Sequence, residues 1–239
     1  MNTPLDLNNF RVKAAPPTIF YIPNFITKDE EEYLWRQVYS APKPKWTHLS
    51  NRRLQNWGGL PHPKGMVAED LPKWLETYCE KIAELKVFEE KKVPNHVLVN
   101  EYEAGQGIMP HEDGSLYYPT VSTLSLGSHT LLDFYKPLQS SESGDDTSPI
   151  HSTSLEERYM QSILLEPRSL VLICDDMYKV YLHGIAECKS DVMTDKVANI
   201  DLCDTANIGD NLERTTRVSL TIRYVPKILK AKLVFGKKR

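Results

Sequence analysis

Two histidines and one carboxylate occur in an order that indicates a metal site. His111 and Asp113 are separated by one residue, and His183 follows after a long interval. Two histidines and one carboxylate form the facial triad of non-haem iron(II) oxygenases, which leaves part of the metal open to other ligands. Arg217 and Arg223, six residues apart, suit a small dicarboxylate beside such a metal, because guanidinium groups bind carboxylates in bidentate geometry. If these side chains converge, the chain is an enzyme that activates oxygen.

Each part of this set also has an ordinary structural explanation. An H-x-D triplet near a strand end places its first and third side chains on one side of the chain. The same triplet is common in surface turns, and here Gly114 follows Asp113 directly. A single histidine such as His183 is more often a core or surface side chain than a ligand, although the other five histidines offer no equally placed partner.

The segment 217–223 alternates as a β-strand would. One face carries Arg217, Ser219, Thr221 and Arg223, and the other carries Val218, Leu220 and Ile222. Such a strand is either a half-solvated sheet edge or a barrel strand whose polar face lines a cavity. Asn100 and Tyr102 share one face of an earlier expected strand and are able to donate further hydrogen bonds to the same carboxylate. The alternatives are a strand-end turn for Asn100 and core packing for Tyr102.

Two helices followed by short strands are expected to position these residues. Thr27 and Glu30 have capping-box spacing, which predicts a helix from there to about Tyr39. Apolar residues at three- and four-residue steps predict a second helix from Asp70. From Pro94 the period changes to two. Strand-like runs cover residues 19–22, 96–102, 120–126, 130–135, 162–165, 169–174 and 217–225. This pattern predicts an α+β chain with a sandwich or jelly-roll core behind N-terminal helices.

The chain of 239 residues is expected to form one domain. We expect that domain over residues 18–226, after a flexible leader at 1–17 and before a basic tail at 227–239. Polar insertions are expected at 138–160 and 187–214. Residues 40–67 are rich in Pro, Gly, Trp and basic residues and lack sustained periodicity, which predicts an extended surface segment.

The composition excludes several classes of protein. A net charge of -3 provides no global signature of nucleic-acid binding, so any basic surface must be local. The four cysteines show no CxxC spacing, and with no secretory segment this predicts a reducing intracellular compartment. The longest apolar runs, such as Ser169–Cys174, are too short to span a bilayer. No membrane partner is expected.

The successive motifs resemble those of the AlkB-like iron(II)/2-oxoglutarate dioxygenases over about residues 95–225. The motifs are Asn100-Glu101-Tyr102-Glu103-Ala104-Gly105, His111-Glu112-Asp113, Leu124-Ser125-Leu126-Gly127-Ser128, His183-Gly184-Ile185 and Arg217 through Arg223. The resemblance implies a double-stranded β-helix fold, with iron(II) held by His111, Asp113 and His183. It implies 2-oxoglutarate as cosubstrate with O2, contacted by Asn100, Tyr102, Arg217, Ser219, Thr221 and Arg223. Arg217 is then expected at the distal carboxylate and Arg223 nearer the metal.

The family acts on alkylated DNA, alkylated RNA or proteins, so the resemblance leaves the substrate open. Residues 43–58 interleave cations and aromatics, as a nucleic-acid lid would. The lid residues are Lys43, Lys45, Trp46, Arg52, Arg53 and Trp57. The alternative is a surface loop whose tryptophans dock onto the core. Tyr117 and Tyr118 are expected either at the pocket mouth or as ordinary loop aromatics. The basic tail suits phosphate binding or a nuclear address, or merely improves solubility.

One position departs from the pattern of base-repairing relatives. These often carry an acidic residue two positions after the metal-binding aspartate, where this chain has Ser115. Protein and unusual nucleic-acid substrates therefore stay open. The leading hypothesis is oxidative demethylation of alkylated nucleic acid, preferably single-stranded, by a monomer in the nucleus and cytoplasm. The alternatives are a protein hydroxylase or demethylase, and a nucleic-acid-binding module with negligible turnover.

Overall fold

The computed structural model describes residues 5–16, 18–89, 91–137 and 154–229. Its helices are η1 (Leu7–Phe10), α1 (Lys28–Tyr39), η2 (Lys43–Lys45), α2 (Lys73–Ala83), α3 (Leu155–Arg158), α4 (Asp175–Lys179) and η3 (Ile200–Leu202). The strands of the first half are β1 (Ile19–Ile22), β2 (Thr47–Leu49), β3 (Arg52–Trp57), β4 (Gly59–His62), β5 (Gly65–Ala68), β6 (His96–Tyr102) and β7 (Ile108–His111). Those of the second half are β8 (Thr120–Gly127), β9 (Thr130–Tyr135), β10 (Tyr159–Leu165), β11 (Leu170–Cys174), β12 (Leu182–Ile185), β13 (Ser190–Val192), β14 (Asn211–Glu213), β15 (Arg217–Arg223) and β16 (Ile228–Leu229).

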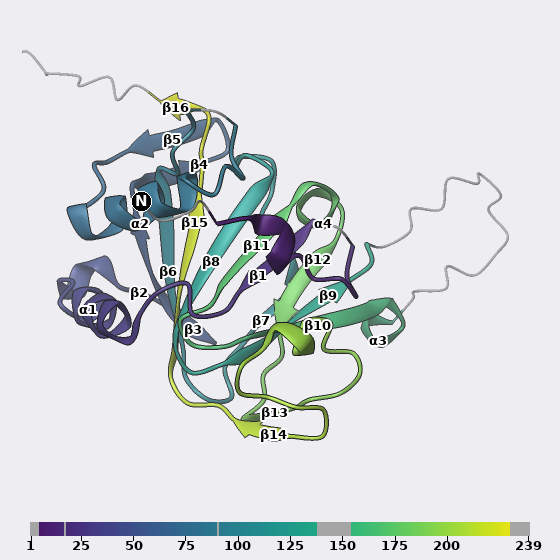
Figure 1. Cartoon of the computed structure of the whole chain (residues 1–239). Helices are drawn as coiled ribbons and strands as arrows, with labels where there is room; N and C mark the ends of the chain where they lie inside the picture. The colour runs from purple at the N-terminus through teal and green to yellow at the C-terminus, as the bar shows by residue number, and fades with distance from the viewer. Residues whose placement is uncertain (1–4, 17, 90, 138–153, 230–239) are drawn as a thin grey trace, which may run out of the picture.

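Two antiparallel sheets form the core of the molecule (Figure 1). The larger sheet has the strand order β1-β11-β8-β15-β6-β3-β2, and the smaller has the order β10-β9-β12-β7. Apolar side chains from both sheets, including Tyr21, Phe134 and Ile163, form one buried cluster. The arrangement is the predicted jelly roll, in which two sheets bury their facing sides against each other.

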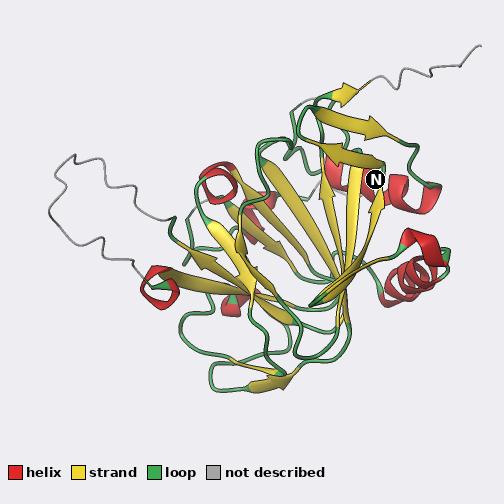
Figure 2. Cartoon of the chain, turned by 180° about the vertical axis from the view of Figure 1, so that it is seen from behind, coloured by secondary structure: helices red, strands yellow, loops and turns green. Residues whose placement is uncertain are grey.

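The two long helices cover the outer face of the larger sheet (Figure 2). The predicted capping box of α1 is present, with Thr27 accepting from the amide of Glu30 and the Glu30 carboxylate accepting from the amide of Thr27. Helix α2 begins at Lys73 rather than at Asp70, because Pro72 takes an extended conformation as its N-cap. Both helices bury apolar residues against the sheet. Within the described residues, no helix is long and apolar enough to cross a membrane.

Strand β15 is central, not an edge, because it pairs along its whole length with β6 and with β8. Its apolar residues Val218, Leu220 and Ile222 lie in the cluster beneath the helices. Its polar residues therefore point into the space between the sheets, where Arg217, Ser219 and Arg223 are buried. The cavity interpretation of the alternating strand is confirmed.

The predicted surface segment at residues 40–67 is wrong. It contains β2 to β5, and β3 joins the larger sheet by pairing with β6. Sequence periodicity missed β3 because polar residues occur on both of its faces. Gln55 is fully buried, but its amide donates to the carbonyl of Val38. A strand whose buried positions hold satisfied polar groups shows no hydropathy alternation.

Two further segments are more ordered than expected. In the expected leader, Val12 is fully buried and its amide bonds to Ile19, so residues 5–16 pack against β1. The expected insertion at 187–214 carries the β13–β14 ribbon and buries Met193 and Val197 in a small apolar cluster. Arg214 also forms a fork with Asp191, at 2.6 Å for each of two hydrogen bonds. Residues 138–153 of the other insertion and 230–239 of the basic tail lie outside the described residues.

Candidate metal centre and cosubstrate cavity

Two histidines on neighbouring strands form the centre of the site. His111 ends β7 and pairs directly with His183 on β12, with the ring centroids 4.6 Å apart. Asp113 lies two residues beyond β7. The ligand atoms of these three side chains all lie within 4.8 Å of one another, and no other such group occurs in the described part of the chain. The three residues predicted to bind metal therefore converge on one point.

The protonation states of these residues suit metal binding. Nδ1 of His111 lies 2.8 Å from the carbonyl oxygen of Met109. Because a carbonyl only accepts, Nδ1 carries the proton and the Nε2 lone pair is left for a metal. Burial lowers the pKa of His183 to about 4, so that its imidazole is neutral at physiological pH. Burial alone would raise the pKa of Asp113, but the positive charge and hydrogen bond of the neighbouring Arg223 lower it, and the group stays ionised.

A cavity of about 160 Å³ extends from these three side chains into the space between the sheets. All of the residues predicted to contact the cosubstrate line it: Asn100, Tyr102, Arg217, Ser219, Thr221 and Arg223. Arg223 donates to Oδ1 of Asp113 and so marks the metal end, whereas Arg217 lies at the other end of β15. This is the order that we expected for the two arginines.

Arg217 is a buried cation that has no counter-charge among the residues that the structure describes. Its side chain donates to the Ser125 hydroxyl at 2.9 Å, and its Nε has no partner among the described residues. Burial lowers the pKa of Arg217 to about 10. A buried, unpaired charge is costly, so this end of the cavity is suited to an anionic ligand.

Comparison with known proteins assigns the family. The model of the 2OG-Fe(II) oxygenase superfamily matches residues 35–223. A relative from Danio rerio, named "Probable RNA/DNA demethylase ALKBH6", is 58% identical over 98% of this chain and 97% of its own length. The chain is an AlkB-like 2-oxoglutarate/iron(II) dioxygenase.

Solved structures support the fold of this dioxygenase. A 2OG-Fe(II) oxidoreductase from Burkholderia pseudomallei is 9% identical, with a TM-score of 0.56 over 93% of this chain and 91% of that one. The structure of OsALKBH1 is 14% identical, with a TM-score of 0.52 over 87% of this chain and 97% of that one. At this level of identity the likeness shows the jelly-roll fold alone.

The residues of the dioxygenase fit the groups that the family uses. Oδ2 of Asp113 and Nε of Arg223 are both buried and find no hydrogen-bond partner in the described part of the chain. A ferrous ion bound by His111, Asp113 and His183 would use the first atom. A dicarboxylate reaching from the metal to Arg217 would pair the buried guanidinium. Two nitrogen donors, one carboxylate and an adjoining arginine-lined cavity therefore match iron(II) and 2-oxoglutarate.

The predicted nucleic-acid lid is largely on the wrong side of the larger sheet. Arg53 forms a two-bonded ion pair with Glu101, and its guanidinium stacks over Trp46 at 4.2 Å. Lys45 stacks over Trp57 at 4.3 Å, and both tryptophans pack against the cluster beneath the helices. The alternative of tryptophans docked onto the core therefore describes this segment. Lys43 is exposed nearby, and Arg52 alone of the lid residues lines the cavity.

The two tyrosines after the metal triplet lie in different surroundings. The guanidinium of Arg223 lies 4.6 Å from the ring of Tyr117, which places Tyr117 beside the metal end. Tyr118 packs against Phe88 in the cluster on the other side of the sheet. Tyr117 therefore stays a candidate for the site, whereas Tyr118 is a core residue.

Several residues that shape the site were not predicted from the sequence. Ser125 accepts from Arg217, and Phe134 lies with its ring centroid 6.5 Å from that of His183. The Tyr178 hydroxyl donates to the carbonyl of Gly114 at 2.9 Å and so holds the loop after Asp113. Ser125 lies in the 124–128 motif that carried the family resemblance, but the motif gave it no role. Nothing in the types or spacing of Phe134 and Tyr178 distinguishes them, because their role comes from contacts across strands.

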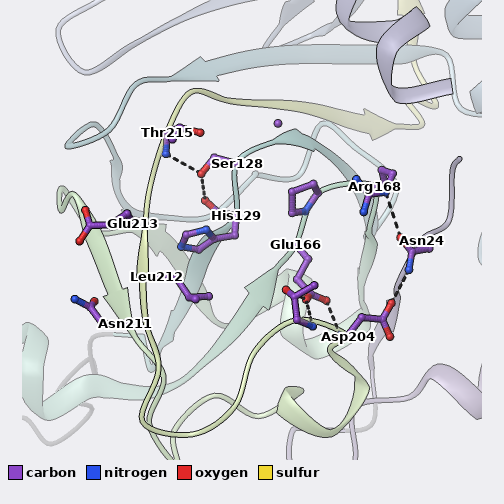
Figure 3. A pocket seen from close by; sticks show the side chains of 13 residues that line it. Asn24, Ser128, His129, Glu166, Arg168, Asp204, Asn211, Leu212, Glu213 and Thr215 are labelled. Carbon is purple, nitrogen blue, oxygen red and sulfur yellow. Dashed lines mark hydrogen bonds between the residues drawn. The ribbon is translucent and has the colours of Figure 1, made fainter. Parts of the chain in front are cut away.

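A larger cavity, of about 560 Å³, lies away from the metal centre (Figure 3). It is bordered by the β8–β9 turn, the β10–β11 turn and the segment 204–215. Its carboxylate Glu166 already accepts hydrogen bonds from Tyr21, Asp204 and Thr205. Arg168 is likewise engaged with Asn24 and Glu31. Both of these charged groups already bond to other parts of the protein, so neither is left to bind a ligand in this cavity.

Proposed function

We propose that this dioxygenase removes methyl groups from nucleic acid by oxidation, using iron(II), 2-oxoglutarate and O2. The observation that carries the proposal is the convergence of His111, Asp113 and His183 at one end of a cavity whose other end holds the uncompensated cation Arg217. The choice of nucleic acid is supported by the name of the Danio rerio relative, "Probable RNA/DNA demethylase ALKBH6". A location in the nucleus and cytoplasm and action as a monomer remain predictions.

The residues of the chain bind, orient and shield the reactants. The triad would hold the metal on one side only, which leaves positions for cosubstrate and oxygen. Arg217 would pair one carboxylate of 2-oxoglutarate, and apolar side chains such as Ile108 and Leu132 would exclude water around the metal. Iron(II) and 2-oxoglutarate, once bound, would supply the oxidising chemistry: one O2 would be used to form succinate and CO2 and to hydroxylate an N-methyl group, which would then leave as formaldehyde.

The Arg223 guanidinium has a positioning role in this scheme. It bonds to Oδ1 of Asp113 and so leaves the second oxygen, Oδ2, for the metal. It also keeps the carboxylate ionised, because its positive charge opposes the effect of burial on the pKa. Arg223 therefore couples the metal end of the cavity to the strand that carries the other cosubstrate residues.

The test is a cosubstrate-consumption assay with candidate methylated substrates. Succinate and formaldehyde would be measured with iron(II), 2-oxoglutarate and either N-methylated single-stranded oligonucleotides or N-methylated peptides. We expect equal amounts of both products with the oligonucleotides and neither with the His111→Ala variant. Circular dichroism and a metal titration would show that this variant is folded but does not bind metal.

Each other outcome has a definite meaning. Products formed with the peptides and not with the oligonucleotides would replace the proposal by a protein demethylase. Strand binding without metal-dependent succinate formation would make the chain a binding module. Wild-type turnover in His111→Ala would overturn the site itself.

A further inference from the structure

Arg52 lies on the cavity face of β3, unlike its neighbour Arg53. The antiparallel register pairs Arg53 with Glu101 and Leu54 with Asn100. Side chains of one strand alternate between faces, so Arg52 shares the face of Leu54 and Asn100. The Nε of Arg52 accordingly donates to Oδ1 of Asn100 at 3.2 Å. Arg52 is therefore fixed at the cavity by a residue that belongs to the cosubstrate wall.

Apart from Nε, the Arg52 guanidinium bonds to none of the described residues. The bond to Asn100 is the one hydrogen bond that its side chain makes with the described residues, and no ion pair involves it there. The side chain is half-buried. The hairpin that carries Arg52 is held in place next to it, where the side-chain amide of Asn51 donates to Glu187. The terminal nitrogens are thus held near the cavity, free to bind a ligand.

The charges around the cavity exceed what the metal and cosubstrate need. Three guanidinium groups line it, from Arg52, Arg217 and Arg223, and Asp113 is the single carboxylate among the lining residues. A ferrous ion adds two positive charges, and 2-oxoglutarate adds two negative ones. Two positive charges remain uncompensated in a partly desolvated site, where electrostatic interactions are strong. Arg223 is already bonded to Asp113, so Arg52 is the guanidinium left for the substrate.

We propose that Arg52 binds a phosphodiester of the substrate strand next to the reacting base, and that the pocket favours neutral over cationic methylated bases. This inference rests on the proposed nucleic-acid function and adds to it a preference among methylated bases. A guanidinium fork suits phosphate oxygens. A phosphate on Arg52 would offset one of the two surplus positive charges, so a base that carries a positive charge would still meet the second, and Asp113, the metal ligand, is the single carboxylate among the lining residues. A neutral N-methylated base meets no such penalty.

The first experiment measures binding rather than turnover. A fluorescein-labelled single-stranded dT12 would be titrated with the protein loaded with Mn(II) and 2-oxoglutarate at several salt concentrations. Arg52→Gln should weaken binding about tenfold and reduce the slope of log K against log salt by about 0.7, the value for one phosphate contact on a single strand. Arg52→Lys should restore part of the slope. Lys64→Gln, at an exposed residue of the β4–β5 turn, is the charge-matched control.

The 2-oxoglutarate titration separates the two ligands that Arg52 is able to hold. We expect the affinity of the Mn(II) protein for 2-oxoglutarate to change less than twofold in Arg52→Gln. A large loss of 2-oxoglutarate affinity with an unchanged salt slope would assign Arg52 to the cosubstrate and overturn the proposal. An unchanged salt slope with unchanged 2-oxoglutarate affinity would show that Arg52 does not contact the oligonucleotide, and would leave the proposed function intact. Failure of the wild-type protein to bind the strand would overturn the role of Arg52, whereas the proposed function is decided by product formation from methylated oligonucleotides.

The second experiment compares two bases in the same strand. One oligonucleotide carries 3-methylthymine, which is neutral, and the other carries 1-methyladenine, which is cationic at pH 7. We expect formaldehyde release from the neutral base to be about tenfold faster than from the cationic base. The ratio of these two rates should be smaller in Arg52→Gln. A wild-type preference for the cationic base would refute the specificity.

Discussion

The uncompensated charge of Arg217 should make the metal-free protein less stable than a variant that lacks this charge. Burial lowers the pKa of Arg217 from the ordinary value of arginine to about 10. A shift of this size corresponds to ~3 kcal/mol against the folded state. Since the folded-state pKa is the lower one, this penalty is fully present below pH about 10 and disappears only above the ordinary pKa of arginine.

The substitution Arg217→Met keeps most of the side-chain volume and removes the charge. It also removes the hydrogen bond to Ser125, a loss of ~1 kcal/mol. The net expectation is a stabilisation of ~2 kcal/mol. For a chain of this length that corresponds to a rise in Tm of roughly 4–8 °C. The same variant should lose the additional stabilisation that 2-oxoglutarate provides to the metal-loaded wild-type protein, because a ligand stabilises only in proportion to its binding.

The assay is thermal unfolding at pH 7, first without metal and then with Mn(II) and increasing 2-oxoglutarate. Arg36→Met, at an exposed residue of α1, is the matched control. It should change neither the Tm of the apoprotein nor the rise in Tm on addition of 2-oxoglutarate. The reasoning is refuted if Arg217→Met unfolds at a lower temperature than the wild-type apoprotein. It is also refuted if the variant retains the full shift on addition of 2-oxoglutarate.

Two further predictions concern the strands and the insertion around the site. Gly184→Ala should fold but bind Mn(II) at least tenfold more weakly. The new Cβ would lie 2.9 Å from the backbone nitrogen of Pro110 and would push β12 away from β7. Calorimetric titration would measure the affinity, and an unchanged value would contradict this prediction. Burial alone would raise the pKa of Asp191, but the hydrogen bonds from Arg214 and the nearby His129 imidazole lower it to about 2. The stability from this carboxylate is therefore complete above pH ~4 and is lost as the pH falls toward 2. Urea unfolding would measure the free energy of unfolding of the wild-type protein and of Asp191→Asn. The difference between the two should shrink by ~2 kcal/mol from pH 7 to pH 2. A difference that does not change with pH would show that the ionisation of Asp191 does not contribute to stability.

The arrangement of chemically active residues was predictable where types and spacing carried the signal. His111 and Asp113 were recognisable as a pair because the chemistry of an H-x-D triplet is local. The alternation of 217–223 was visible because Val218, Leu220 and Ile222 share one apolar face in the helix-side cluster. Helix α1 was predictable because its capping box depends on neighbouring residues alone.

The failed predictions share a physical cause. Residues 52–57 form a strand whose polar side chains are satisfied by other parts of the chain, such as Arg53 by Glu101. Hydropathy reports the transfer of a side chain from water and contains no information about its hydrogen-bond partner. The interleaved cations and tryptophans therefore suggested a nucleic-acid surface, although most of them stabilise the helix side of the sheet.

By itself, the order of residues determined the chemistry: a metal triad, two arginines on one strand face and an AlkB-like family. Only the tertiary structure decided which of these groups are left unsatisfied. The β7–β12 register brings His183 opposite His111, and β3 aims Arg52 into the cavity and Arg53 away from it. Cross-strand register is set by the packing of whole sheets, so it depends on distant residues together and no local pattern contains it.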